Sequence, residues 1–206
     1  MRAAILLNGE APNFMVSSLL KDRFVICADG AYDWAAAQDI KIDILAGDFD
    51  SVHIDLSNVK DTIDIKKYSA DKNMTDGQIC LDILIERGYK DIIFLGGGGK
   101  RDDHFFAAIQ LLYRALLQGC NCIFYTNYCE IYITDSVFLK KIKLNTTLSL
   151  VPFFESVHII YTKGLRYKLT KHLLKACESL GVSNVVTDEN VEIKVENGIA
   201  LIFLIK

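Results

Sequence analysis

The first 125 or so residues alternate short apolar runs with amphipathic helical patterns. The apolar runs at residues 3–8, 24–28, 44–46, 91–95 and 122–126 predict strands, and the patterns at residues 14–20, 32–38, 76–87 and 103–118 predict helices. Strands that alternate with helices pair in parallel, and strands that are apolar on both sides need helices on both faces of the sheet. This part of the chain is therefore expected to be α/β, with a mostly parallel sheet flanked by helices.

The helix predicted from Asp76 has clear signals at both ends. Thr75 and Gln78 have the spacing of a capping box, and Gly88 is placed to end the helix. Apolar side chains four residues apart, such as Ile79 and Ile83, give the helix a buried face. Asp76 is therefore expected in the first turn of this helix.

The pattern changes near residue 130. Short β-branched and aromatic runs at residues 131–134, 147–152, 157–161, 191–195 and 200–205 predict strands, and a helix is predicted within 169–180. The turn signal Glu196-Asn-Gly198 separates the last two strands. We expect residues 1–128 to form the α/β domain and residues 129–206 an all-β, sandwich-like domain.

Composition excludes several classes of protein. The chain has 206 residues, of which 51% are hydrophobic, and this is ample for a buried core. Its net charge of −3 gives no footprint for nucleic acid. No apolar run is long enough to cross a membrane or to act as a secretory signal, so a cytoplasmic location is expected. The six cysteines lack CxxC or zinc spacing and are expected to be reduced core thiols.

Acidic residues follow the predicted strands at the points where the strands end. Asp29 follows one strand, Asp48 and Asp50 follow the next, and Asp76 opens a helix. The carboxyl ends of parallel strands share one edge of the sheet, so these side chains are expected to converge. Two like charges about 5 Å apart repel by roughly 3 kcal/mol at an effective dielectric constant near 20. A cluster of oxygen ligands therefore needs a cation, and Mg²⁺ suits it best.

The run Gly96-Gly-Gly-Gly99 follows another predicted strand at the same edge. Glycines allow the main chain to approach a phosphate closely, and Arg101 adds a bidentate fork for phosphate oxygens. The run is neither a Walker P-loop nor a G-x-G-x-x-G motif, because Arg101 occupies the deciding position in both. Acids, Mg²⁺, a glycine loop and arginine together favour phosphoryl or pyrophosphoryl transfer.

Each of these residues also has a purely structural interpretation. Thr75 and Asp76 serve equally well as a helix cap and a first-turn acid. His104, in the first turn of a helix, is expected to be a packed or capping histidine, and Trp34 to be a core residue. The functional interpretation depends on the joint occurrence of several carboxylates at one predicted edge.

Several of these segments resemble the thiamine pyrophosphokinases, in the same order and with roughly the same spacing. The N-terminal ones are Ala28-Asp-Gly30, Gly47-Asp-Phe-Asp-Ser51, Thr75-Asp76 and Gly96 to His104, and the C-terminal ones are Ser149 to Pro152, Thr162 to Tyr167 and Gly181 to Asn184. The resemblance covers nearly the whole chain. Members of that family transfer a pyrophosphoryl group from ATP to the hydroxyethyl oxygen of thiamine, release AMP, and work as homodimers with an α/β and a β-sandwich domain.

The resemblance implies a role for each candidate residue. The Mg²⁺ ligands would be Asp29, Asp48, Asp50 and Asp76, and the catalytic residues would be Asp48, Asp50, Asp76, Arg101 and Asp103. The phosphates would be held by Lys72, Asn73, Thr75, Gly97, Gly98 and Arg101, and thiamine by Thr162, Lys163, Gly164 and Tyr167 across the dimer interface. Residues 1–128 would then bind nucleotide and metal, and residues 129–206 thiamine and the second subunit. Asp103 is the candidate for orienting or deprotonating the hydroxyl group.

Four positions depart from the usual family pattern. Lys100 stands for a glycine, Ala108 for an asparagine, Asn73 for an aspartate and Tyr167 for a tryptophan. Tyrosine still stacks on a cationic thiazolium ring. Three alternatives stay open: a pyrophosphokinase of another small alcohol such as a pterin, a nucleotide-binding regulator without turnover, and a metal-dependent phosphoesterase.

Overall fold

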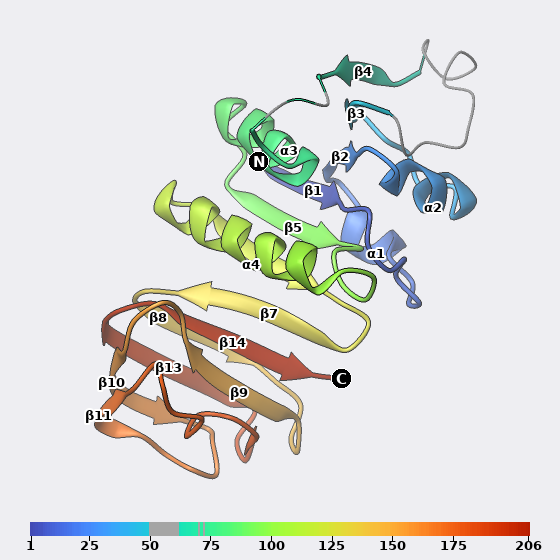
Figure 1. Cartoon of the computed structure of the whole chain (residues 1–206). Coiled ribbons are helices and arrows are strands. Elements are labelled where there is room, and N and C mark those ends of the chain that lie inside the picture. Colours follow the sequence, from blue (N-terminus) through green and yellow to red (C-terminus); the bar gives the residue numbers. More distant parts are fainter. Residues whose placement is uncertain (50–61, 70, 72) are drawn as a thin grey trace. The chain divides into compact units, whose positions relative to one another are not determined.

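The computed structural model describes residues 1–49, 62–69, 71 and 73–206 (Figure 1). The chain divides into two compact units, Met1–Asn127 and Tyr128–Lys206. The first unit is α/β with a parallel sheet and the second is built from antiparallel strands, so the predicted fold class is confirmed. No helix in the described ranges is long and apolar enough to span a membrane.

Strands and helices alternate along the first unit. In chain order they are β1 (Arg2–Leu6), α1 (Ser17–Leu20), β2 (Phe24–Ala28), α2 (Ala31–Ala37), β3 (Ile44–Gly47), β4 (Asp64–Lys67), α3 (Asp76–Glu86), β5 (Asp91–Leu95), α4 (Asp102–Leu117) and β6 (Asn121–Tyr125). The strands pair in parallel in the order β6-β5-β1-β2-β3-β4. Strand β4 was not predicted, because its sequence Asp-Ile-Lys-Lys is polar and lies at the exposed edge of the sheet.

The strand order has one reversal point, between β1 and β5. The chain runs outward from β1 to β4 and then returns to β5 on the other side of β1. In the pairing register, Leu6 of β1 lies opposite both Cys27 of β2 and Leu95 of β5. The segments that follow these strands therefore start level with one another. Open α/β sheets bind ligands at such a reversal point, beyond the carboxyl ends of the strands.

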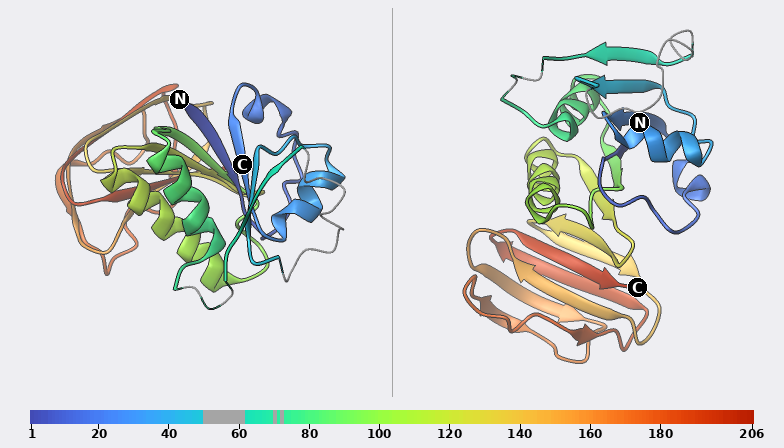
Figure 2. Two further views of the ribbon diagram at one scale, coloured as in Figure 1. Left: turned by 90° about the horizontal axis from the view of Figure 1, so that it is seen from above. Right: turned by 45° about the vertical axis from the view of Figure 1, so that its right-hand side comes forward.

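Helices cover both faces of this sheet. Helices α1 and α2 lie on one face and α3 and α4 on the other (Figure 2, left). Neighbouring residues of β1 point to opposite faces, and both Ile5 and Leu6 are fully buried. Leu6 packs in a cluster with Tyr32 and Ala35 of α2. The continuous apolar strands in the sequence reflect this double covering.

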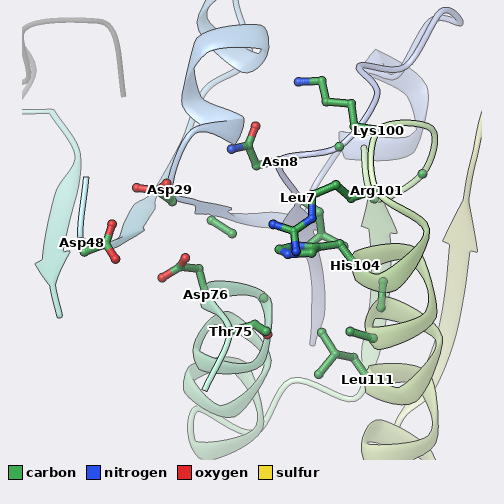
Figure 3. A pocket seen from close by; sticks show the side chains of 17 residues that line it. Leu7, Asn8, Asp29, Asp48, Thr75, Asp76, Lys100, Arg101, His104 and Leu111 are labelled. Carbon is green, nitrogen blue, oxygen red and sulfur yellow. The ribbon is translucent and has the colours of Figure 1, made fainter. Parts of the chain in front are cut away.

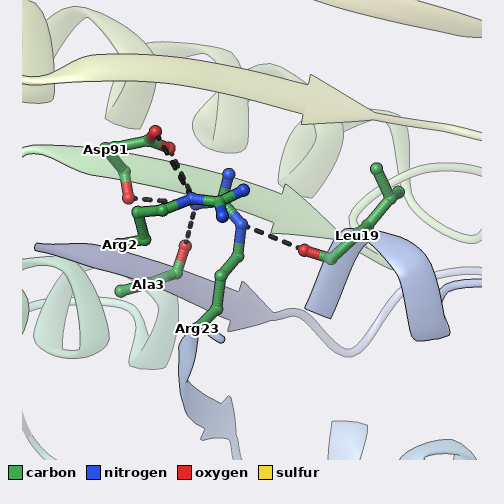
Figure 4. Close-up of polar contacts among 5 residues, drawn as sticks. All are labelled: Arg2, Ala3, Leu19, Arg23 and Asp91. Atoms are coloured by element: carbon green, nitrogen blue, oxygen red, sulfur yellow. Dashed lines mark hydrogen bonds and ion pairs between the residues drawn. The ribbon is translucent and has the colours of Figure 1, made fainter. Parts of the chain in front are cut away.

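Arg23 ties three elements together at the amino-terminal edge of the same sheet (Figure 4). Its guanidinium group donates hydrogen bonds to the carbonyl oxygens of Leu19, Ala3 and Asp91, and to the Asp91 carboxylate at 2.7 Å. The Arg23 side chain is only 7% exposed. A buried charge is tolerated when it is paired and hydrogen-bonded in this way.

The second unit contains two antiparallel sheets in the described residues. Its strands are β7 (Cys129–Thr134), β8 (Val137–Lys141), β9 (Thr147–Pro152), β10 (Val157–Lys163), β11 (Thr170–Leu174), β12 (Asn184–Val185), β13 (Asn190–Asn197) and β14 (Ala200–Ile205). They pair in the orders β12-β9-β14-β7 and β11-β10-β13-β8.

The prediction of a helix within residues 169–180 is wrong. Strand β11 occupies the first part of that range, with Thr170 paired to Tyr161 and Leu174 paired to Val157. Turns follow it, up to the start of β12. Pairing with β10 buries Leu174 completely, and this tertiary contact outweighs the local helical pattern. The cysteine prediction holds for five side chains, which are buried, while Cys177 is exposed.

Candidate functional site

A pocket of about 340 Å³ lies in the first unit at the reversal point of its sheet. It is lined by residues that follow β1, β2, β3 and β5, by the first turn of α3 and by one face of α4 (Figure 3). Its size is at the lower end of the range for small-molecule sites, which is roughly 300–1,000 Å³.

Three of the predicted aspartates line this pocket. Asp29 follows β2, Asp48 follows β3 and Asp76 begins α3, and their side chains lie on one side of the pocket in Figure 3. Asp29 is only 5% exposed, and one of its carboxylate oxygens accepts a hydrogen bond from the N–H of Phe49 at 2.9 Å. One carboxylate oxygen of Asp76 is also buried. The convergence predicted from the strand ends is thus observed for these three side chains.

Gly47 allows the strand ends that carry two of these acids to approach each other. A Cβ atom at Gly47 would lie 2.8 Å from the Cβ atom of Asp29 and 2.9 Å from its Oδ1 atom. Contacts this short exclude any side chain at position 47 unless the neighbouring strand moves. Asp29 itself has a positive φ of 44°, a backbone conformation that aspartate tolerates better than most residues.

The acids suit a hard cation chemically but do not form a finished coordination sphere. Among the residues that the structure describes, no three His, Cys, Asp or Glu side chains are gathered as a metal-binding group. Asp50, the fourth predicted ligand, lies outside the described residues. The donors of Asp29, Asp48 and Asp76 are all carboxylate oxygens, which is the ligand type that Mg²⁺ prefers.

The start of α3 has both the structural and the site position predicted for it. The Thr75 hydroxyl accepts a hydrogen bond from the N–H of Gln78 at 3.2 Å, which confirms Thr75 as the helix cap. Thr75 and Asp76 also line the pocket, so the two interpretations coexist. Asn73 is exposed and does not line the pocket, and Lys72 lies outside the described residues.

The glycine loop is held against the segment that follows β1. The N–H of Gly9 donates to the carbonyl oxygen of Gly96, and the N–H of Glu10 donates to that of Gly98, both at 2.6 Å. Gly97 and Gly98 line the pocket as predicted from the sequence. Asn8 and Gly9 line it too, and sequence reasoning missed both. Their role depends on β1 being the strand next to the reversal point, and only the strand order shows that.

Basic side chains lie across the pocket from the aspartates. Lys100, Arg101 and His104 line this side, with Arg101 just before α4 (Figure 3). Arg101 also forms a bidentate pair with Asp103, with Nε–Oδ1 and NH2–Oδ2 distances of 3.1 and 2.5 Å. The hydrogen bond from Arg101 lowers the pKa of the Asp103 carboxyl group. Asp103 is exposed and does not itself line the pocket.

One face of α4 forms a wall of the pocket that is apolar apart from His104. His104, Ala107, Ala108 and Leu111 have the spacing of a single helix face, and all four line the pocket. The expectation that His104 packs inward or caps the helix is therefore replaced by a position on the pocket wall. Ala107 and Leu111 were not predicted as site residues, because apolar residues at helical spacing are usually core.

The remaining candidate residues belong to the second unit. Thr162 is buried, and its hydroxyl accepts a hydrogen bond from the N–H of Leu169 at 2.9 Å. Lys163 forms an ion pair with Glu192 at 2.7 Å. Gly164 has a φ of +76°, which favours glycine. These contacts give the segment a fixed backbone turn.

Tyr167 stands at the end of this turn with its ring in solvent. The residue is 63% exposed. Its backbone, by contrast, is held by hydrogen bonds. The N–H of Tyr167 donates to Asn184 Oδ1 at 3.0 Å, and Asn184 Nδ2 donates to the carbonyl oxygen of Tyr167 at 2.7 Å. An exposed ring on a fixed backbone is available to contact a ligand.

Comparison with known proteins agrees with both units. The family profile described as thiamin pyrophosphokinase, catalytic domain, matches residues 16–124, and the one described as its vitamin B1 binding domain matches residues 136–200. A thiamine pyrophosphokinase from Bacillus subtilis (strain 168) is 29% identical over 119 residues, which are 57% of this chain and 56% of that protein. The sequence match thus covers little more than half the length of this relative.

Solved structures show the same fold. The thiamine pyrophosphokinase from Bacillus subtilis superposes with a TM-score of 0.88 at 20% identity, covering 100% of this chain and 99% of that one. The yeast thiamin pyrophosphokinase superposes with a TM-score of 0.82 at 17% identity, covering 100% of this chain and 86% of that one. The catalytic-domain profile alone spans more than half of the 206 residues. The chain therefore belongs to the thiamin pyrophosphokinase family.

Proposed function

We propose that this chain is a thiamine pyrophosphokinase, which transfers the pyrophosphoryl group of ATP to the hydroxyl oxygen of thiamine and releases AMP. The observation that carries the proposal is the pocket at the reversal point of the sheet. There, three aspartates face Lys100 and Arg101, with the glycine loop beside them. The names of the Bacillus subtilis and yeast relatives support the choice of substrate.

The pocket residues divide the work of holding a charged phosphate chain. The backbone of Gly97 and Gly98 allows close approach of the phosphates, and Lys100 and Arg101 offset their negative charge. Asp29, Asp48 and Asp76, together with Asp50, would hold Mg²⁺. When bound, this ion adds positive charge next to the phosphate oxygens. Positioning and charge stabilisation supply most of the rate in reactions of this class.

The proposed transfer forms one bond and breaks one. The thiamine hydroxyl oxygen bonds to the β-phosphorus, and the bond from that phosphorus to the oxygen bridging to the α-phosphate breaks, so AMP leaves with the bridging oxygen. The hydroxyl proton is lost to a base or to water. The role of Asp103 in accepting this proton or orienting the hydroxyl group stays a prediction. Its hydrogen bonds with Arg101 support an additional role in orienting the guanidinium group.

The second unit would supply the thiamine site. The exposed ring of Tyr167 is suited to stack on the cationic thiazolium ring, and the turn through Gly164 fixes its backbone. Thr162 and Lys163 belong to the same segment. We include the homodimer and the cytoplasmic location in the proposal, with this segment contributing to a site across the dimer interface.

A nucleotide assay tests the proposal directly. The protein is incubated with ATP, Mg²⁺ and thiamine, and the nucleotides are separated by chromatography. AMP that forms only when thiamine is present supports the proposal. ADP would indicate an ordinary kinase, and AMP formed only with another alcohol, such as a pterin, would change the substrate. ATP binding without any product would indicate a regulatory protein.

A further inference from the structure

Trp34 contacts the ends of the two strands that border the reversal point. Its Nε1–H donates a hydrogen bond to the carbonyl oxygen of Leu7 at 3.1 Å. The same ring packs on Gly96, where an added Cβ atom would lie 2.8 Å from Trp34 Cζ2. Leu7 follows β1 and Gly96 follows β5. A single side chain on α2 therefore touches two of the segments from which the pocket is built.

Through these contacts Trp34 acts on a pocket-lining residue from outside the pocket. Trp34 does not line the pocket, whereas Leu7 does. The side chain of Leu7 extends toward α3 and the glycine loop, since Cβ atoms added at Gly77 and Gly97 would lie 2.9 and 2.7 Å from its methyl groups. The carbonyl group of Leu7 is bound by Trp34, and its side chain forms part of the wall.

The glycine loop turns directly beside the Trp34 ring. Gly96 has a φ of +73°, and an added Cβ atom would also lie 2.7 Å from the carbonyl oxygen of Leu7. Backbone hydrogen bonds from Leu7 N–H to Leu95 and from Gly9 N–H to Gly96 continue the strand pairing past the turn. The ring thus packs at the point where regular pairing gives way to the loop.

We propose that Trp34 is a positioning residue for the nucleotide phosphates: it holds Leu7 and Gly96 so that the glycine loop has its binding shape before ATP arrives. The inference depends on the proposed function, because it takes this loop as the phosphate site. A loop that is ordered in advance gives tighter binding, since less order has to be imposed when the ligand binds. The effect concerns ATP, and thiamine affinity is independent of it.

The first test replaces Trp34 by phenylalanine, which keeps a ring and removes the N–H donor. The Kd of ATP with Mg²⁺ by calorimetry and the KM for ATP are expected to rise roughly 3- to 10-fold, the range for one lost hydrogen bond. The KM for thiamine is expected to stay within about twofold of the unmodified protein. Ile40→Val is the control, because Ile40 packs against the same core cluster, and it is expected to lower Tm without changing ATP affinity.

The second test does not depend on a substitution that alters packing. Trp34 is the only tryptophan in the chain, so 5-fluorotryptophan labelling gives a single ¹⁹F resonance. Because the loop is ordered before ATP binds, this resonance is expected to be narrow in the unliganded protein and to keep its width when ATP with Mg²⁺ saturates the protein. A resonance that is broad or doubled without ATP, and becomes single and narrow when ATP binds, contradicts the inference.

The two proposals fail in different ways. Unchanged ATP affinity in Trp34→Phe, with thiamine-dependent AMP still formed by the unmodified protein, would overturn the role of Trp34 alone. Absence of thiamine-dependent AMP from the unmodified protein would overturn the proposed function. Loss of ATP affinity in Ile40→Val equal to that in Trp34→Phe would reduce Trp34 to a core residue.

Discussion

Arg101 donates hydrogen bonds to both carboxylate oxygens of Asp103, from Nε at 3.1 Å and from NH2 at 2.5 Å. Arg101 lies between the glycine loop and α4, Asp103 lies in the first turn of α4, and only Arg101 lines the pocket. Both side chains are well exposed, so the pair adds little to stability. Its effect is to fix the direction of a guanidinium group beside the proposed phosphate site.

This pair predicts an unusual titration of Asp103. Because the folded-state pKa is lowered by the hydrogen bond from Arg101, the carboxylate stays ionised below the pH at which an ordinary aspartate is protonated. The contribution of the pair is present above the unfolded-state pKa and is lost as pH falls through the folded-state value. Carboxyl ¹³C NMR should show this, and Arg101→Gln should raise the pKa of Asp103 toward that of an ordinary aspartate. An ordinary pKa in the unmodified protein would contradict the observed geometry.

Asp48→Asn should abolish turnover while the fold stays intact. The substitution removes one charged oxygen donor from the aspartate side of the pocket, and we expect kcat to fall by roughly 100-fold or more. Asp39→Asn is the control, because Asp39 lies in the turn after α2 at a φ of +52°, which asparagine adopts readily. Near-normal activity of the Asp48 variant would remove this residue from the metal site.

Gly9→Ala should disrupt the glycine loop. A Cβ atom at Gly9 would lie 2.6 and 2.7 Å from the carbonyl oxygens of Gly96 and Gly98, and backbone atoms cannot yield without moving the loop. We expect a loss of about 1–3 kcal/mol in the free energy of unfolding, together with weaker ATP binding. Gly98→Ala is the control for stability, because the nearest atom to an added Cβ lies at 3.9 Å. Equal Tm values for the two variants would count against close packing at Gly9.

Arg23→Ala should lower stability without changing the chemistry of the pocket. It leaves three carbonyl groups and the Asp91 carboxylate without their common donor, and we expect a loss of about 2–4 kcal/mol in denaturant unfolding. Arg2→Ala is the matched control, because its contact with Asp91 is 3.8 Å long and half-exposed, and should cost less than about 1 kcal/mol. Similar losses in both variants would show that burial of Arg23 does not matter.

The sequence predicted the fold wherever a local pattern carried the information. Continuous apolar runs predicted five of the six parallel strands described in the first unit, because these strands are buried on both faces. Strand β4 has one covered edge and a polar sequence, and no apolar run marks it. The segment around Leu173 has apolar spacing that fits a helix, and only its partner strand decides that it is extended.

The candidate site was predictable where it depended on strand ends. The positions of Asp29, Asp48 and Asp76 follow from the rule that parallel strands share one carboxyl edge. Asn8 and Gly9 could be placed in the site only once the order of the strands was known, and Ala107 and Leu111 only once α4 was seen to line the pocket. The local sequence pattern contains neither piece of information. Trp34 was assigned to the core, and its hydrogen bond to Leu7 adds a contact that composition does not reveal.

A ³¹P NMR time course of the reaction tests the central claim most directly. With ATP, Mg²⁺ and thiamine, the proposal predicts that the signals of AMP and thiamine diphosphate grow together in equal amounts, and that neither appears when thiamine is omitted. Growth of ADP with a thiamine monophosphate signal, or no thiamine-dependent change at all, would contradict it.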